Sequence, residues 1–72
     1  MEEILYKYFG DKKTKFYHPS DSIADDNFIR WSYFNGERGR ILLSIGSNEV
    51  ETNIRIFDDP TQLEDIIKLI LF

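Results

Sequence analysis

Cysteine is absent from this 72-residue sequence, and histidine occurs once, at His18. Without cysteine there is no disulfide framework and no cysteine-ligated zinc site, and the composition fits a reducing compartment. A single histidine lacks the partners that a histidine metal site or a serine–histidine mechanism needs. The acids that follow it, Asp21, Asp25 and Asp26, lack the alternating positions and central glycine of a calcium loop. We therefore expect no metal, no cofactor and no enzymatic activity.

Long apolar runs and nucleotide-binding motifs are also missing. No stretch approaches the roughly 20 apolar residues of a membrane-spanning helix, and the start, Met1-Glu2-Glu3, lacks the basic segment of a signal peptide. The four glycines form neither a G-x-G-x-x-G fingerprint nor a phosphate loop, and no serine lies in G-x-S-x-G. The expected protein is cytoplasmic and makes no membrane contact.

What the sequence does contain is enough apolar surface for a small folded domain. Apolar residues make up 42% and aromatic residues 15% of the chain, which favours one folded domain over residues 1–72 rather than disorder. A chain of this length buries only about 60% of the surface that its unfolded form exposes, so a partner or a second copy would add needed stability. With a net charge of −4, the chain is a poor ligand for duplex nucleic acid, where phosphate neutralisation dominates affinity.

Periodicity and turn residues divide the chain into helices and strands. Apolar residues in EEILYKYF recur at helical spacing and stop at Gly10. The segment DDPTQLEDIIKLILF has Asp59 as a candidate N-cap, Pro60 at the first helical position and an apolar stripe. The predicted order is helix 2–9, strand 14–18, loop 19–27 with Ile23 as its one apolar anchor, strands 28–34, 40–45 and 49–57, and helix 58–72.

The predicted fold class follows from this order. Short loops join the strands, so they pair antiparallel. We expect a small α+β domain with an antiparallel sheet of three to four strands and helices at both ends (α-β-β-β-β-α). The apolar stripe of the last helix packs it on one sheet face; its residues are Leu63, Ile66, Ile67, Ile70 and Leu71.

The register between strands 28–34 and 40–45 decides which side chains form the core. Asn35-Gly36 is a strong signal for a two-residue turn, but that turn alone would put arginines on the same face as Trp31. A turn with an odd number of residues, such as 37–39 with its glycine left-handed, changes the face of one strand. It gathers six apolar residues worth roughly 1.5–3 kcal/mol each, so we predict the odd turn. The residues are Ile29, Trp31, Tyr33, Ile41, Leu43 and Ile45.

For the next connection we predict a two-residue turn at Ser47-Asn48. This register adds Val50, Thr52, Ile54 and Ile56 to the same apolar face. The opposite face then carries arginines among aromatic and polar residues. Its predicted members are Phe28, Arg30, Ser32, Phe34, Arg40, Leu42, Ser44, Glu51, Asn53, Arg55 and Phe57.

This second face is the main candidate for function. Arginine and aromatic residues are enriched in protein interfaces, and the predicted partner-binding residues are Phe28, Arg30, Phe34, Arg38, Arg40, Arg55 and Phe57. Two other interpretations stay open. The N-terminal helix or loop 19–27 covers the phenylalanines, with arginine stems across them. Alternatively, the face stacks single-stranded bases through Phe28, Phe34, Arg30 and Arg40, although the Lys/Arg-Gly-Phe pattern of sheet-type RNA binders is absent.

The two ends of the chain carry further hypotheses. Acids around the last helix, Asp58, Asp59, Glu64 and Asp65, either complement the helix dipole or join an acidic patch that mimics phosphates. The other members of that patch would be Glu2, Glu3, Asp25 and Asp26. Leu69 and Phe72 fall outside the apolar stripe, so either the N-terminal helix covers them or they form a self-association seam in a homodimer.

Together these features predict a non-enzymatic protein-interaction module, a small acidic adaptor or inhibitor that binds another protein. The alternative is a domain that binds single-stranded nucleic acid. The short acidic chain would suit an inhibitor encoded by a phage or plasmid.

Overall fold

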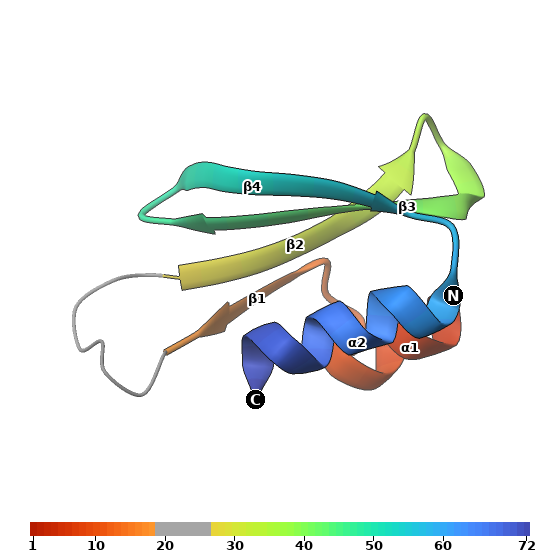
Figure 1. Cartoon of the computed structure of the whole chain (residues 1–72). Coiled ribbons are helices and arrows are strands. Elements are labelled where there is room, and N and C mark those ends of the chain that lie inside the picture. The colour runs from red at the N-terminus through yellow and green to blue at the C-terminus, as the bar shows by residue number, and fades with distance from the viewer. Residues whose placement is uncertain (19–26) are drawn as a thin grey trace.

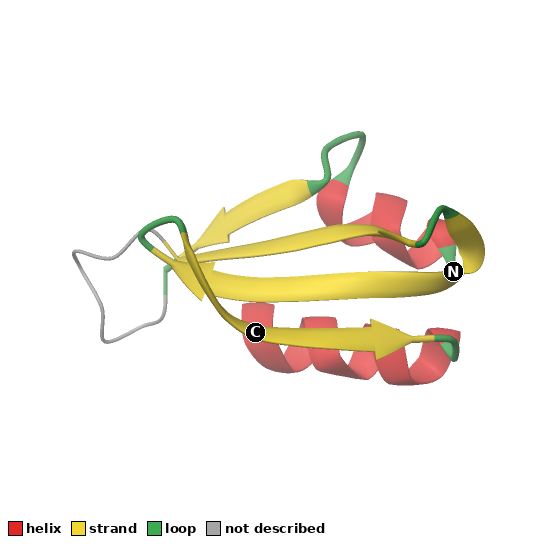
Figure 2. Cartoon of the chain, turned by 90° about the horizontal axis from the view of Figure 1, so that it is seen from above, coloured by secondary structure: helices red, strands yellow, loops and turns green. Residues whose placement is uncertain are grey.

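The computed structural model describes residues 1–18 and 27–72, and it has the predicted α-β-β-β-β-α order. The strands form one antiparallel sheet in the order β1-β2-β3-β4. Both helices lie on one face of it (Figures 1 and 2). The predicted α+β class is therefore confirmed. The elements are α1 (Glu2–Phe9), β1 (Thr14–Tyr17), β2 (Asn27–Phe34), β3 (Glu37–Ser47), β4 (Val50–Phe57) and α2 (Pro60–Leu71).

Local sequence explains where the helices begin and end. The Asp59 side chain accepts a hydrogen bond of 2.9 Å from the Thr61 backbone N–H, as expected of an N-cap, and Pro60 is the first helical residue. Gly10, with φ of 66°, ends α1 in a conformation that favours glycine. The predicted loop anchor Ile23 lies outside the described residues.

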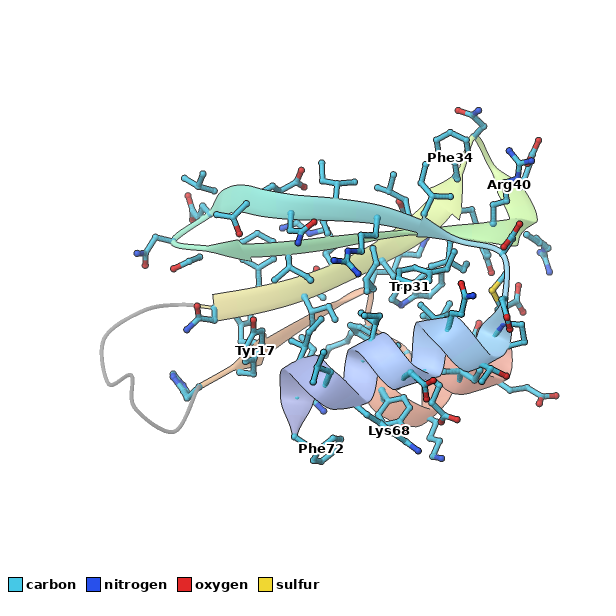
Figure 3. All side chains as sticks on the ribbon, in the orientation of Figure 1. Tyr17, Trp31, Phe34, Arg40, Lys68 and Phe72 are labelled. Atoms are coloured by element: carbon cyan, nitrogen blue, oxygen red, sulfur yellow. The ribbon has the colours of Figure 1, made fainter. Side chains whose placement is uncertain are left out.

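The core fills the space between the helices and the sheet. Trp31 of β2 points into this space (Figure 3), and its buried indole N–H has no hydrogen-bond partner in the described part of the chain. The Lys13 ammonium lies 5.1 Å from the centre of that ring. The buried cluster consists of Leu5, Phe9, Ile29, Trp31, Ile41, Leu43, Phe57, Leu63 and Ile67.

The β2–β3 register confirms that the apolar residues of the two strands share one face, but the turn that produces this register differs from the prediction. Trp31 pairs with Leu43, so the apolar residues of both strands face the helices. The turn is nevertheless Asn35-Gly36, with φ of 53° and 73°, and the predicted left-handed Gly39 was wrong. The odd count comes from a bulge, because pairing jumps from Phe34–Glu37 to Tyr33–Ile41. The bulge lets the chain satisfy both the Asn-Gly turn preference and the match of apolar faces.

The β3–β4 register differs from the prediction. The turn is Asn48-Glu49, with φ of 52° and 69°, and pairing then shifts from Gly46–Glu51 to Ile45–Asn53. This bulge leaves Thr52 without a cross-strand partner residue, and its hydroxyl donates to the Ile45 carbonyl at 3.2 Å.

That bulge reverses the faces predicted for β4. Ile54 and Ile56 pair with Ser44 and Leu42 and face away from the helices, whereas Phe57 pairs with Ile41 and joins the core. Phe57 lies just before α2, so its burial seats the start of that helix against the sheet. One large aromatic side chain thus enters the core in place of two isoleucines.

Gly46 makes the second bulge sterically feasible. A Cβ atom at this position would lie 2.5 Å from Cζ of Phe28 and closer still to the Val50 carbonyl oxygen. The Phe28 ring therefore packs directly over the glycine backbone across the β2–β3 ladder.

We predict that Gly46→Ala destabilises the fold by about 1–3 kcal/mol, because the new methyl group overpacks this contact. The control is Gly39→Ala, whose Cβ would meet nothing within 4 Å, so its unfolding free energy should change by about 0.5 kcal/mol or less. Urea unfolding of both variants measures the difference. Equal stability of the two variants would contradict the bulge geometry.

A polar cluster joins the two helices on their solvent side. The Tyr8 hydroxyl donates to a Glu64 carboxylate oxygen at 2.9 Å, and the Lys7 ammonium donates to the same atom at 3.3 Å. The hydrogen bond from Tyr8, followed by that from Lys7, holds the pKa of Glu64 below its ordinary value. The same contact with Glu64 raises the pKa of Lys7.

We predict that this cluster makes stability depend on pH. A lowered folded-state pKa means that the unfolded chain binds more protons at Glu64, so stability falls as pH drops through the folded-state value. Glu64→Gln should therefore be less stable than wild type above about pH 4.3, the ordinary glutamate value, and the difference should vanish at lower pH. Urea unfolding across this range tests the prediction. A difference that is independent of pH would contradict it.

Candidate functional site

The sheet face opposite the helices is the candidate site, and we call it the open face. In Figure 1 both helices lie below the sheet and the upper side carries no described helix. The cross-strand register arranges its side chains in three rows. The rows are Phe16, Phe28, Gly46 and Glu51; Thr14, Arg30, Ser44 and Ile54; and Ser32, Leu42 and Ile56.

Apolar side chains on the open face are well exposed. Phe16 is 65% exposed, Ile54 53% and Ile56 50%. Leu42, half-buried, pairs directly with Ile56, and Ile54 is the next residue of β4 on this face. The β3–β4 half of the face thus carries an aliphatic patch, and Phe16 lies on the opposite edge strand.

Arg30 occupies the centre of the open face and is held in place by its neighbours. Its Nε donates to the Thr14 hydroxyl at 3.2 Å, and its guanidinium lies 3.8 Å from a Glu51 carboxylate oxygen. Its Cζ lies 5.0 Å from the centre of the Phe28 ring. Phe28 is only 2% exposed and Ser44 is equally buried, so the centre of the face offers a guanidinium rather than a phenyl ring.

The predicted partner-binding residues separate into three groups. Arg30 and Phe28 lie on the open face, as predicted, but Phe28 is covered. Arg55 and Phe57 were placed on the wrong face, because the bulge at Thr52 turns both toward the helix side. Phe57 is buried in the core, whereas Arg55 stays exposed on the edge strand.

The third group lies at the β2–β3 turn. Phe34 and Arg40 are at this end of the sheet, on the side away from the helices (Figure 3), and Arg40 lies 3.7 Å from Glu37. Arg38 turns to the helix side, where its guanidinium lies 3.4 Å from Glu2. These arginines therefore sit beside carboxylates of the same chain.

Tyr33 completes a cluster that fastens this turn to α1. Its hydroxyl donates to a Glu2 carboxylate oxygen, and the Arg38 guanidinium lies 6.0 Å from its ring. The hydrogen bond to Glu2 is the main cause that raises the pKa of Tyr33, with burial second. The hollow beside it, lined by Met1, Glu2, Glu3 and Arg38, has a volume of about 510 Å³ and is open to solvent.

The residues of the predicted self-association seam at the C-terminus are largely exposed. Helix α1 packs beside α2 and the Tyr8 ring meets that of Phe72 edge-on at 6.4 Å, yet Leu69 is 77% and Phe72 90% exposed. Of the two alternatives, burial of both residues by α1 is therefore wrong, and their role in self-association stays a prediction.

Several carboxylates of the predicted acidic patch form contacts with other residues of the same chain. Asp59 caps α2, Glu64 binds α1, and Glu2 binds Tyr33 and Arg38. Asp58, Asp65 and Glu3 are exposed. Asp25 and Asp26 lie outside the described residues, so their place in such a patch stays a prediction.

The described residues contain no group of three His, Asp or Glu side chains arranged to hold a metal ion. His18 is exposed just after β1. No helix in the described part of the chain is long and apolar enough to span a membrane.

Sequence reasoning missed Ile54 and Ile56 as surface residues. It placed Leu42 on this face without naming it as a partner-binding residue, and it did not assign Phe16 to the face. The missed signal is Gly46, which stands next to the turn where a bulge most easily changes the strand register. Comparison of the chain with family models, with curated proteins and with solved structures found no match. The proposed function therefore rests on the open face itself.

Proposed function

We propose that this protein is a non-enzymatic interaction module that binds another protein through the open face. The observation that carries the proposal is the aliphatic patch of Leu42, Ile54 and Ile56 on the sheet face opposite both helices, with Arg30 at the centre of that face and Phe16 exposed on its other edge. Contiguous exposed apolar surface marks interaction sites in soluble proteins, and arginine and aromatic residues are enriched in such sites.

The arrangement of the open face suits tight contact. Covering a fully exposed isoleucine is worth roughly 1.5–3 kcal/mol, and the two isoleucines here are about half exposed. Thr14 and Glu51 already hold the Arg30 guanidinium, so a partner would pay little entropy to fix it. Arg30 would act as a polar anchor beside the aliphatic patch.

The same face favours a protein over single-stranded nucleic acid. Base stacking needs accessible rings, but Phe28 is covered and Phe34 is half-buried, so Phe16 is the one well-exposed ring among the described phenylalanines on this side of the sheet. Phosphate binding needs net positive charge, yet in the described part of the chain Arg30 is paired with Glu51 and Arg40 with Glu37.

The class of protein in the proposal is a small adaptor or inhibitor in the cytoplasm. Its acidic helix ends, with Glu3, Asp58 and Asp65 exposed, would form a second contact zone for a partner with a basic rim. The short acidic chain would suit an inhibitor carried by a phage or plasmid.

We predict that Ile54→Asp abolishes partner binding without loss of the fold, because the residue is exposed on an edge strand. The matched control is Leu69→Asp, the same aliphatic-to-aspartate change at an exposed residue on α2. Each protein would be immobilised and exposed to lysate of the organism that encodes it. Mass spectrometry should find proteins retained by wild type and Leu69→Asp but lost with Ile54→Asp.

Two outcomes would contradict the proposal. Retention of the same proteins by all three baits would show that the open face does not bind them. Binding of short fluorescent oligonucleotides at low salt, lost at high salt, would instead assign the function to nucleic-acid binding.

A further inference from the structure

We infer that the partner of the open face adds an extended segment of its own chain to the outer edge of β4, with an acidic side chain opposite Arg55 and apolar side chains opposite Ile54 and Ile56. This inference rests on the proposed function, since it names how the partner of that face is held and which sequence pattern it offers. The state of the two sheet edges, the register of β4 and the charge of Arg55 each support it.

Strand β4 is the uncovered edge of the sheet. It stands last in the strand order, and each of its residues except Phe57 is exposed. The other edge strand, β1, has only four residues, three of them half-buried, and its Lys15 donates to the Tyr8 carbonyl of α1. An edge strand directs the N–H and C=O groups of alternate residues outward, where another strand can pair with them. Of the two edges, β4 is therefore the one open to strand addition, a common mode of peptide recognition.

Beyond its bulge, β4 offers a regular stretch for pairing. Residues 53–57 pair one to one with residues 41–45 of β3, and a strand of that length spans roughly 17 Å. Ile54 and Ile56 lie on the open face, and Arg55 between them lies on the helix side. A strand laid antiparallel against this stretch has its own side chains on the same two faces in alternation. Its apolar residues would therefore extend the aliphatic patch.

Arg55 supplies the charge that selects the added segment. The other three arginines of the chain each lie 3.4–3.8 Å from a carboxylate oxygen of the same chain. Arg55 has no carboxylate partner among the described residues, and it is exposed on the uncovered edge. Opposite charges directly across a strand pair stabilise it, and like charges destabilise it. A glutamate or aspartate therefore fits opposite Arg55, between two apolar residues.

A second copy of this chain does not meet that requirement. When two such stretches of β4 pair antiparallel about a two-fold axis, the residue opposite Arg55 is Asn53, Arg55 or Phe57 of the other copy, depending on the register. None of these side chains is negative. Two copies, each with a net charge of −4, also repel each other. The added segment therefore belongs to a different protein.

Selection from a displayed library of random peptides of about nine residues, long enough to cover the stretch, tests the inference on the immobilised full chain. Peptides retained by wild type should be enriched in the pattern apolar–acidic–apolar. Arg55→Glu should replace the acidic residue of this pattern by lysine or arginine, because the charge across the strand pair is reversed. Lys12→Glu makes the same change in net charge at another exposed residue and should select the wild-type pattern. Absence of enrichment, or a pattern that Arg55→Glu leaves unchanged, would overturn the inference.

A synthetic copy of one selected peptide locates the contact on the wild-type protein. It should shift the backbone amide signals of residues 53–57 and slow their hydrogen exchange. Changing its acidic residue to lysine should weaken binding to wild type about threefold to tenfold, and Arg55→Glu should restore the loss. Amide shifts confined to β1 or α2 would place the contact elsewhere and overturn the inference.

Arg55→Ala separates attraction from protection. A charge on an edge strand can also serve to keep other strands away, in which case its removal would tighten binding of the selected peptide and overturn the inference. We expect the opposite, a loss of about twofold to fivefold in affinity.

Failure of this inference is distinct from failure of the proposed function. If a captured protein is lost with Ile54→Asp but the peptide selection finds no pattern that depends on Arg55, the open face stands as a binding site and strand addition is overturned. If peptides add to β4 as described but no captured protein depends on Ile54, strand addition is supported and the proposed role of the open face is overturned.

Discussion

The pairing of β3 with its two neighbours is the constraint on which the rest of the structure depends. Each hairpin contains a bulge, one near Tyr33 and one at Thr52. Because side chains alternate between faces, each bulge reverses the face of everything beyond it. The first bulge brings Trp31 and Leu43 together on the sheet face that packs against the helices. The second bulge turns Phe57 toward the core and the β4 isoleucines toward the open face. Core and open face are therefore fixed by the same two irregularities.

An element could be predicted from the sequence where one arrangement of its side chains was clearly more favourable than the others. The helices were predictable, because Asp59, Pro60 and Gly10 act locally. The shared face of β2 and β3 was also predictable, since one register gathers six apolar residues and the other mixes them with arginines. Strand β4 has two competing registers. One turns its aliphatic residues toward the core, and the other turns Phe57 toward the core. A left-handed Glu49 in the turn was not expected, because the Cβ atom of an ordinary residue clashes with the backbone in that conformation.

The candidate site was likewise predictable only in part. An open face with Arg30 at its centre followed from the strand period. Its exposed apolar members did not, because Phe57 and Arg55 exchange faces with Ile54 and Ile56. The packing of the Phe28 ring on Gly46, with the Arg30 guanidinium 5.0 Å from the centre of that ring, is a contact between two strands that no local pattern encodes. The surface offered to a partner is consequently more aliphatic, and less aromatic and less basic, than the alternation of the sequence indicates.

Methyl NMR with a soluble paramagnetic agent tests the central claim, the placement of the isoleucines, most directly. At a concentration where the chain is monomeric, the agent should broaden the methyl signals of Ile54 and Ile56 strongly. The signals of Ile29 and Ile41, which the helices cover, should remain sharp. Protection of Ile54 and Ile56 together with broadening of the Phe57 ring signals would show that β4 has the opposite face inside and would contradict the account.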